Sequence, residues 1–387
     1  MSGPSNLLQL PGDEERKFFV LIGLRTSIRT RRRIVHREYV HTRCEIAITD
    51  KVMRIALVLG LCGVSSVTSA QSAVTLYGVL DTSLELTNPG NGWTTRMDSG
   101  AYRGSRFGLM GDESLGGDLH MVFRLESGFS TADGTLSQAG TLFNRQAWIG
   151  MRNDWGEFRL GRQYSPLYIP FKGQLDAFGS GTIASGLDNL SKITPYISDA
   201  LTWVSPNLDG FRTTLVIALR DPSDGDGSGT AGYFLTTQYE AGPLALNYAR
   251  QQTHGVDALR SNLGGASYVF GQWQAWAAFF NGEGGEPYYH AAGYALSLRY
   301  AITAAFDVSA GYTWAKDWSV ADGGARQYSA AIDYTLSRAL KLYASVGDLE
   351  NRGASRFTLR GVNVTGLPAA YPGAPVRGIQ FGLIEQF

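Results

Sequence analysis

The chain has 387 residues, of which 34 are basic and 34 acidic, and only 18% are charged. Glycine (48 residues) and aromatic residues (12%) are abundant, and hydrophobic residues make up 44% of the sequence. This apolar content excludes a collagen-like or an intrinsically disordered chain. The balanced net charge is an average over two unlike parts of the chain, residues 1–70 and residues 71–387.

The first part is basic and contains both cysteines. Residues 1–70 hold 11 Lys or Arg and 6 Asp or Glu, so the remainder has no cysteine for disulfide or thiol chemistry. An arginine cluster at residues 25–43 is able to bind nucleic acid electrostatically, but a secretory signal follows it, and we expect no nucleic-acid partner. We interpret residues 1–52 as an upstream extension from a mis-assigned start codon, with a long genuine leader as the alternative.

Residues 53–70 have the pattern of a secretory signal peptide. Lys51 and Arg54 supply positive charge, a short apolar run follows, and residues 68–70 (Thr-Ser-Ala) form a small-residue cleavage site. The apolar run is too short to span a bilayer as a helix, which needs about 20 residues. The predicted mature chain, residues 71–387, carries 23 basic and 28 acidic side chains, a net charge of −5.

Apolar and polar residues alternate in many segments of the mature chain. Residues 306–314 place Phe, Val, Ala, Tyr and Trp on one face and Asp, Ser, Gly and Thr on the other. This period of two is that of a β-strand with one apolar and one polar face. Residues 119–126, 211–220 and 340–347 repeat it. We expect about sixteen strands, beginning near Ala73, Arg106, Leu119, Phe143, Glu157, Ser198, Phe211, Gly232, Pro243, Asn262, Trp273, His290, Phe306, Arg326, Leu340 and Val376.

The connections between these strands alternate between short turns and long loops. Residues 153–156 and 271–272 are short, whereas residues 88–104, 164–198 and 350–375 are long and rich in Gly, Asp, Asn, Ser and Pro. An even number of strands of about ten residues with this spacing is typical of an all-β transmembrane barrel, which leaves no unpaired backbone in the hydrocarbon. A soluble sandwich or propeller explains the alternation but not the spacing, and the propeller's repeat of about 40–50 residues is absent.

Several motifs, in order along the mature chain, resemble those of general porins from Gram-negative bacteria, in particular the β-proteobacterial type. They are VTLYGVLD at residues 74–81, GSRFGLMGDESLGG at residues 104–117, NRQAWIG at residues 144–150, LGRQY at residues 160–164 and the C-terminal Phe387. The resemblance implies a sixteen-stranded antiparallel barrel that assembles as a homotrimer in the outer membrane, in contact with lipid and lipopolysaccharide. It implies passive diffusion of small hydrophilic solutes and ions. It further implies that Phe387 is a signal for the barrel-insertion machinery.

In that family the third extracellular loop folds into the barrel and narrows it, and residues 164–198 correspond to this loop. The resemblance implies wall arginines, here Arg106, Arg145 and Arg162, facing carboxylates on the loop. Asp176 and Asp188 are the acids that this loop offers. Opposed charges of this kind create a field across the pore that orients dipolar solutes.

Strand alternation refines this constriction. It places Arg124 and Glu126 on the inward face of the third strand as a further lumen pair. It places Arg145 on the outward face, so that a bulge, an interface position or a strand-end position is required, and Arg162 needs a local twist to face inward. Where family members often carry another wall arginine, this chain has Tyr196, which predicts a weaker positive side.

No residue set for catalysis or cofactor binding is recognisable. The mature chain has three histidines, His120, His254 and His290, without the spaced partners of a zinc site, and it has neither a phosphate-binding loop nor a nucleophile elbow. We therefore expect neither an enzyme nor a cofactor. The alternatives are a substrate-specific channel of the same fold, an outer-membrane hydrolase and a secreted binding module.

Overall fold

The structure is a computed structural model that describes most of the predicted mature chain. The predicted extension and the predicted signal peptide lie outside the described part. The described residues are 73–168, 174–179, 181–220, 230–255, 257–361 and 365–387.

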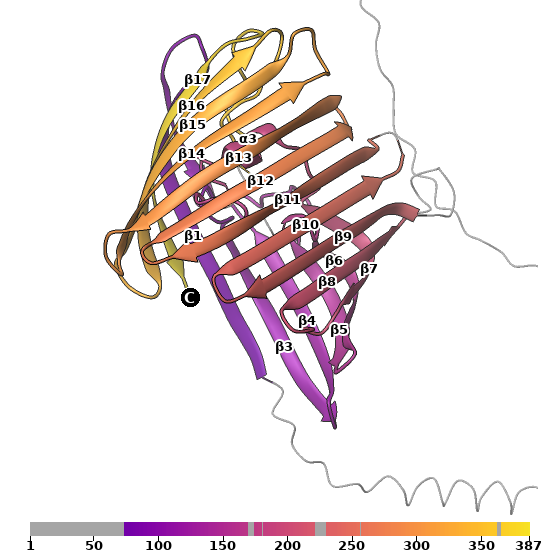
Figure 1. The fold of residues 1–387 in the computed structure, drawn as a ribbon. Coiled ribbons are helices and arrows are strands. Elements are labelled where there is room, and N and C mark those ends of the chain that lie inside the picture. Colours follow the sequence, from indigo (N-terminus) through magenta and orange to yellow (C-terminus); the bar gives the residue numbers. More distant parts are fainter. Residues whose placement is uncertain (1–72, 169–173, 180, 221–229, 256, 362–364) are drawn as a thin grey trace, which may run out of the picture. The chain divides into compact units, whose positions relative to one another are not determined.

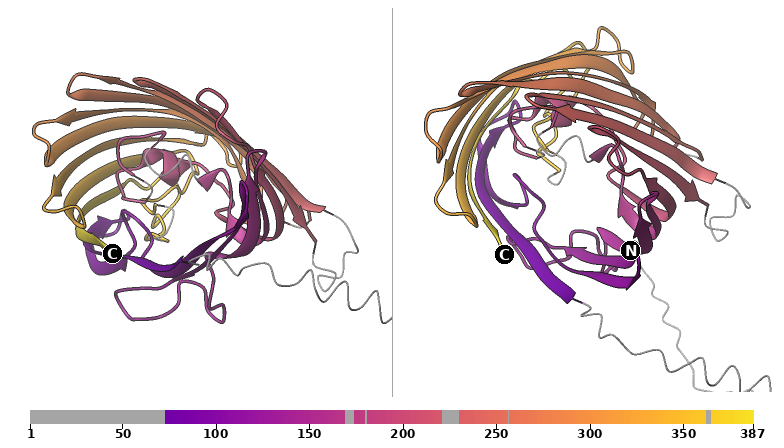
Figure 2. Two further views of the ribbon diagram at one scale, coloured as in Figure 1. Left: turned by 90° about the horizontal axis from the view of Figure 1, so that it is seen from below. Right: turned by 60° about the horizontal axis from the view of Figure 1, so that its bottom comes forward.

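Sixteen long antiparallel strands pair in a ring that closes between β1 and β17 (Figures 1 and 2). All sixteen predicted strands are present and begin within three residues of their expected starts. The strands are β1 (Ala73–Asn88), β2 (Thr94–Ser99), β3 (Arg106–Gly116), β4 (Leu119–Gly128), β5 (Gln146–Asn153), β6 (Gly156–Tyr164), β7 (Tyr196–Val204), β8 (Phe211–Leu219), β9 (Thr230–Ala241), β10 (Leu244–Thr253), β11 (Leu259–Phe270), β12 (Trp273–Gly284), β13 (Tyr289–Ala301), β14 (Phe306–Asp317), β15 (Gly324–Thr335), β16 (Leu340–Arg352) and β17 (Val376–Gln386).

The strand that was not predicted, β2, is a short addition to the first long connection. The first half of β1 pairs with β3, from Ala73 opposite Asp112 to Val79 opposite Arg106. Its second half then pairs on the same side with β2 and on the other side with β17. β2 pairs with the part of β1 that β3 does not reach, so that β2 and β3 together occupy one place in the ring. The ring itself therefore has sixteen strands.

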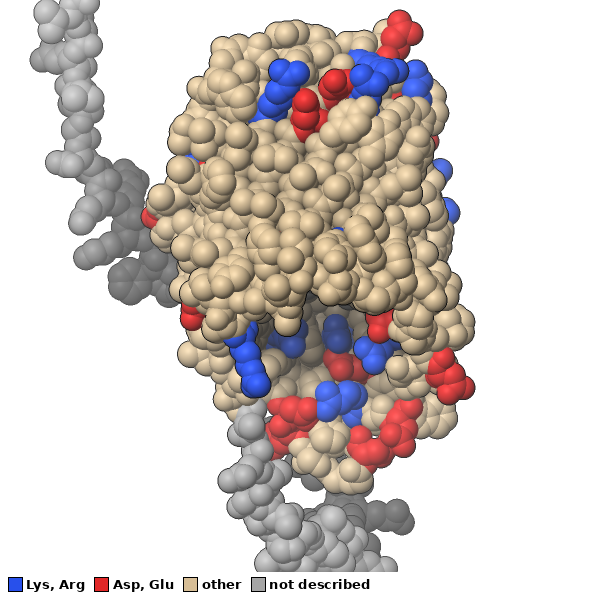
Figure 3. Space-filling model, turned by 60° about the vertical axis from the view of Figure 1, so that its left-hand side comes forward, with Lys and Arg blue, Asp and Glu red and all other residues tan. Residues whose placement is uncertain are grey.

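The alternation of side chains separates the two faces of the barrel as the sequence predicted. On β1, Leu80 and Leu84 point outward and are 40% and 45% exposed, whereas Asp81, Ser83 and Glu85 point inward and are buried. Figure 3 shows the result on one side, where a broad band without charged residues lies below a charged upper rim. Such a surface is stable only where hydrocarbon replaces water around it.

The long connection between β6 and β7 enters the barrel, as predicted: its described residues 165–168, 174–179 and 181–195 lie inside (Figure 2). The Ala177 amide donates to Ser297 Oγ of β13 at 3.0 Å, and Gln327 of β15 donates to the Ile183 carbonyl at 2.9 Å. Its described residues include the short helix α3 (Gly186–Leu190). No helix among the described residues is long and apolar enough to cross a membrane.

A second connection also enters the barrel, which the sequence did not predict. In residues 353–375, between β16 and β17, Leu359 is fully buried. A methyl group added at Gly347 or Gly378 would lie within 3.0 Å of the Leu359 side chain, so this leucine is packed on bare backbone of the wall. We call the described parts of residues 165–195 and 353–375, packed on the wall formed by β11–β17, the loop block.

Candidate pore constriction

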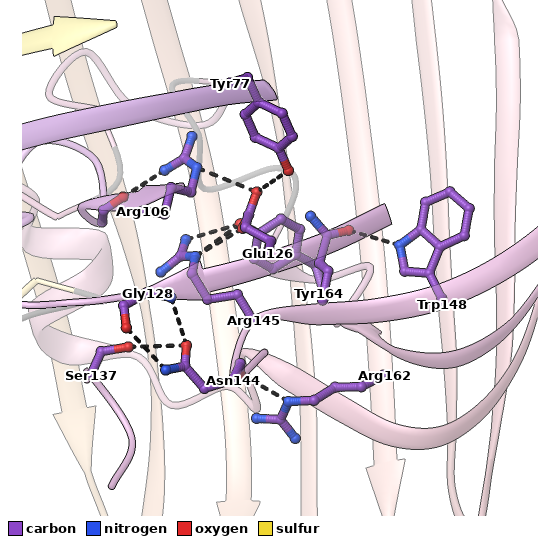
Figure 4. A network of polar contacts seen from close by, with 12 residues as sticks. Tyr77, Arg106, Glu126, Gly128, Ser137, Asn144, Arg145, Trp148, Arg162 and Tyr164 are labelled. Atoms are coloured by element: carbon purple, nitrogen blue, oxygen red, sulfur yellow. Dashed lines mark hydrogen bonds and ion pairs between the residues drawn. The ribbon is translucent and has the colours of Figure 1, made fainter. Parts of the chain in front are cut away.

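Glu126 of β4 is the centre of a polar network on the inner wall (Figure 4). It is 2% exposed, and its carboxylate accepts hydrogen bonds from Tyr77 Oη at 2.7 Å, from Arg145 Nε at 2.9 Å and from the Tyr164 hydroxyl. Arg106 Nε lies 3.5 Å from the other carboxylate oxygen. Two guanidinium groups therefore share one carboxylate. We call Arg106, Glu126 and Arg145 the arginine wall.

Arg145 reaches this network because it precedes the regular strand. β5 begins at Gln146, and the Arg145 amide donates to the Glu126 carbonyl at 3.2 Å. Of the options that alternation left open for this residue, the strand-end position is the one adopted. The guanidinium is 5.4 Å from the ring centres of both Tyr164 and Tyr196. Tyr196, where the resemblance implied a further wall arginine, thus presents its ring to a neighbouring cation.

Arg162 lies at an irregularity of β6. The pairing with β7 shifts register next to Gly161, whose φ of 119° is accessible to glycine. Arg162 donates to the Asn144 carbonyl at 2.8 Å, to Ser198 Oγ at 2.7 Å and to Gln138 Oε1 at 2.9 Å. It therefore ties the connection between β4 and β5 to β7, and among the described residues it makes no hydrogen bond or ion pair with Glu126.

Arg124 is the neighbour of Glu126 on the inward face of β4. Its guanidinium is 5.7 Å from the ring centre of Tyr77, and Nη2 lies 3.6 Å from the Met110 sulfur. Arg124 forms no salt bridge among the described residues. Arg124 and Glu126 therefore lie on the same inward face, as predicted, but they do not form an ion pair, because Glu126 pairs with Arg106 and Arg145.

Asp176 and Asp188 are both buried in the loop block, at 4% and 3% exposure. Asp176 accepts hydrogen bonds from the Phe178 amide and from Ser185 Oγ, and Ser185 also caps α3 by accepting from the Asp188 amide. Burial raises the pKa of Asp176 to about 6. Burial, and then the charge of Asp176, raise the pKa of Asp188 well above its usual value, against the opposing effect of Arg360.

These two carboxyls do not lie against the arginine wall as the resemblance implied. Within the described residues, neither makes an ion pair with Arg106, Arg145 or Arg162. The reason is packing: the loop turns its acids into its own interior. The acid that faces the arginines is Glu126, which belongs to the wall itself.

Arg360 is a site residue that sequence reasoning did not find, because no motif or periodicity marks it. From the last connection it donates through Nη2 to the carbonyls of Asp188, at 3.1 Å, and Ser191, at 2.7 Å. Its amide donates to Asn189 Oδ1 at 2.9 Å. Arg360 thus holds the carboxyl end of α3, where helix carbonyls lack partners within the helix. It joins the two connections into one block.

The three histidines occupy unrelated positions. His120 Nδ1 is 2.6 Å from Asp112 Oδ1 on neighbouring strands, His254 Nδ1 is 3.1 Å from the Thr230 carbonyl, and the ring of His290 packs beside an aromatic ring. In the part of the chain that the structure describes, no group of three or more His, Cys, Asp or Glu is able to hold a metal ion.

The chain ends at the seam of the barrel. The amide of Phe387 donates to the Gly78 carbonyl at 3.1 Å, and the Gly78 amide donates back at 2.9 Å. A methyl group at Gly78 would lie 2.2 Å from the Phe387 ring, so only glycine leaves room for it. Glu385, beside this end, keeps the parity of the outward Phe381 and Leu383 and is only half-buried.

A closed barrel with an apolar outer face, a charged inner wall and loops folded inside is the structure of a membrane channel. The chain matches the model of the Gram-negative porin family over residues 56–354. It therefore belongs to the Gram-negative porin family, and it is an outer-membrane β-barrel of the general diffusion type.

Relatives and solved structures agree with this assignment. The chain is 30% identical to an outer membrane porin of Bordetella pertussis, over 54% of this chain and 64% of that protein. It is 28% identical to outer membrane porin protein 32 of Delftia acidovorans, over 86% of this chain and 99% of that protein. An anion-selective porin from Comamonas acidovorans superimposes with a TM-score of 0.69 at 24% identity, covering 82% of this chain and all of that one.

Proposed function

We propose that the channel passes small hydrophilic solutes with a preference for anions. The observation that carries this proposal is the arginine wall, where Arg106 and Arg145 share the single carboxylate of Glu126. The surplus positive charge lies on the wall that faces the loop block, in a lumen bounded by low-dielectric protein, where a fixed charge acts strongly on passing ions. The carboxyls of the loop block do not offset it directly, because among the described residues neither pairs with Arg106 or Arg145.

The experiment is the reversal potential of the channel formed by residues 71–387 in a planar bilayer under a tenfold KCl gradient. We expect large ohmic steps and a reversal potential of the sign set by chloride. A reversal potential of the potassium sign contradicts the anion preference. The absence of channel steps contradicts the diffusion function itself. Arg212 is an exposed, inward-facing residue of β8 outside the arginine wall. Arg212→Gln therefore measures how far the reversal potential moves when a lumen charge is removed elsewhere.

We also propose that the channel is a homotrimer. The wall from β4 to β8 has strands of 8–10 residues, whereas β9 and β11–β16 have 12 or 13. A shorter wall covers less of the hydrocarbon thickness, which about 9–11 tilted residues span, and contact with neighbouring subunits would shield it. A solved outer membrane protein of Vibrio cholerae, OmpT, is described in a trimer form and superimposes with a TM-score of 0.60. Cross-linking in native membranes tests the oligomer.

The remaining proposals concern processing and insertion. We expect secretion to remove residues 53–70, and N-terminal sequencing of the mature protein tests this. We expect Phe387, with its ring on Gly78 at the seam, to act as the signal for the barrel-insertion machinery. Deleting Phe387 should lower the yield of heat-modifiable barrel in the outer membrane. Separately, we expect lipopolysaccharide to contact the charged upper rim in Figure 3.

A further inference from the structure

We propose that the lumen contains a second station for anions, separate from the arginine wall and nearer the end with the short turns. It takes small oxyanions, carboxylates or phosphates, on their way through the pore. The proposal rests on the proposed channel function. We call the station the vestibule pocket and define it by Arg124, Arg152, Arg159, Asp112 and Glu157.

The vestibule pocket is a cavity of about 340 Å³ in the inner wall formed by β1 and β3–β6. Its side chains come from the inward positions of these strands, among them Thr75, Met110, Val122 and Trp148. Figure 3 shows a hollow near the bottom of the barrel in which charged side chains of both signs gather. The cavity is large enough for a phosphate or a small carboxylate with part of its water.

Two of the three arginines in the pocket are paired with its carboxylates. Arg152 Nη2 lies 2.5 Å from Asp112, which also binds His120, and Arg159 Nε lies 2.6 Å from Glu157. Arg124 makes no ion pair among the described residues. The pocket therefore carries one uncompensated positive charge, which is a condition for holding a passing anion.

Arg124 is oriented for a ligand that the protein does not supply. Among the described residues, the hydrogen-bond partner of its Nη2 is the Met110 sulfur at 3.6 Å, a weak acceptor, and its Nε is buried without a partner. The guanidinium is held near the face of the Tyr77 ring, at 5.7 Å. A planar guanidinium with unused donors matches the oxygens of a carboxylate or phosphate, to which it binds with two parallel hydrogen bonds.

The carboxylates of the pocket already have arginine partners and therefore do not neutralise Arg124. Arg159 stacks on Trp148, at 4.6 Å from the ring centre, while it pairs with Glu157. Trp148 Nε1 is itself held by Gln146 at 3.0 Å. Asp112 and Arg152 remain 47% and 43% exposed at the side chain, so water reaches the pocket. Binding in such a wet site is weak, which a conducting channel needs if the ion is to leave again.

The test is single-channel conductance of the reconstituted porin in increasing concentrations of potassium phosphate and, separately, potassium chloride. The variants are Arg124→Gln, Arg124→Lys and the matched control Arg212→Gln. We expect the phosphate conductance of the unchanged protein to saturate at a lower concentration than that of chloride. Arg124→Gln should raise the half-saturating phosphate concentration about fivefold or more, Arg124→Lys should raise it less, and Arg212→Gln should leave it unchanged.

Three results overturn the proposal: a phosphate conductance that rises linearly in the unchanged protein, no change in Arg124→Gln, or equal changes in Arg124→Gln and Arg212→Gln, which would reduce the effect to the general field of the lumen. All of these leave normal channels. A protein that gives no channel steps in either salt contradicts the proposed diffusion function instead, so the two failures are distinguishable.

Discussion

The two sides of the lumen, the arginine wall and the loop block, differ in where they place their charged side chains. The arginine wall keeps its charges in ion pairs and beside aromatic rings, with Arg106 and Arg145 sharing Glu126. The loop block buries Asp176 and Asp188 without an ion pair among the described residues, and burial raises the pKa of both carboxyls. One side therefore supplies the electric field of the pore and the other supplies mainly its shape. Charge on the loop need not act on solutes.

The largest expected effect follows from breaking the arginine wall. Arg145→Gln leaves Glu126 buried with less compensation, and removing one partner of a buried ion pair typically costs about 3–5 kcal/mol. We expect a lower free energy of unfolding in urea and a reversal potential displaced toward potassium. The double variant Arg145→Gln with Glu126→Gln should recover most of the stability. If the double variant is as unstable as the single one, the ion pair does not carry the effect.

The next effect concerns the shape of the loop block. Leu187 of α3 is 1% exposed, and Leu187→Ala should cost about 2–4 kcal/mol of loop docking because it leaves a cavity. We expect larger current noise and a higher mean conductance with unchanged ion selectivity. The outward Leu201→Ala, on β7 and 42% exposed, is the matched control. If Leu187→Ala changes the selectivity without changing the conductance, the loop block contributes to the electric field of the pore and not mainly to its shape.

A pH dependence should belong to the loop block. The pKa of Asp176 rises from 3.8 to about 6 on burial, so the docked loop binds a proton more tightly than a released loop. Docking is therefore most stable below about pH 4 and weakens as the pH rises through about 6, by about 2–3 kcal/mol. Hydrogen exchange of amides 176–190 measures this after correction for intrinsic rates. Asp176→Asn should remove the part of the dependence that lies between about pH 4 and 6 and leave the part due to Asp188 at higher pH, and exchange that slows as the pH rises contradicts the sign.

The smallest expected effect is that of Tyr196, where two variants compare the contribution of the aromatic ring with that of the hydroxyl group. Tyr196→Phe keeps the ring that lies 5.4 Å from the Arg145 guanidinium and should change neither stability nor selectivity measurably. Tyr196→Leu removes the ring and should lower stability by about 0.5–1 kcal/mol. Thermal unfolding of the two variants side by side provides the comparison. Equal losses in both would assign the role to the hydroxyl.

The periodicity of the sequence predicted the barrel because each strand has one face in contact with lipid and the other face toward the lumen. The same rule placed Arg106, Arg124 and Glu126 inward, but it misplaced Arg145, whose direction depends on where β5 begins. The burial of Asp176 and Asp188, and the contribution of Arg360, were out of reach of the sequence. Loops have no periodicity, and their direction is decided by tertiary contacts such as Leu359 on Gly347.

The pairing of β1 with β17 has a consequence for the biogenesis of the protein. Val79 lies opposite Gln386, so the contact that completes the ring joins residues more than three hundred positions apart. Such distant pairing is slow to form, and until it forms, two strand edges expose backbone groups that a bilayer cannot solvate. The ring therefore cannot close before β17 has been made. A translation product that stops before Val376 lacks the strand that pairs with the second half of β1.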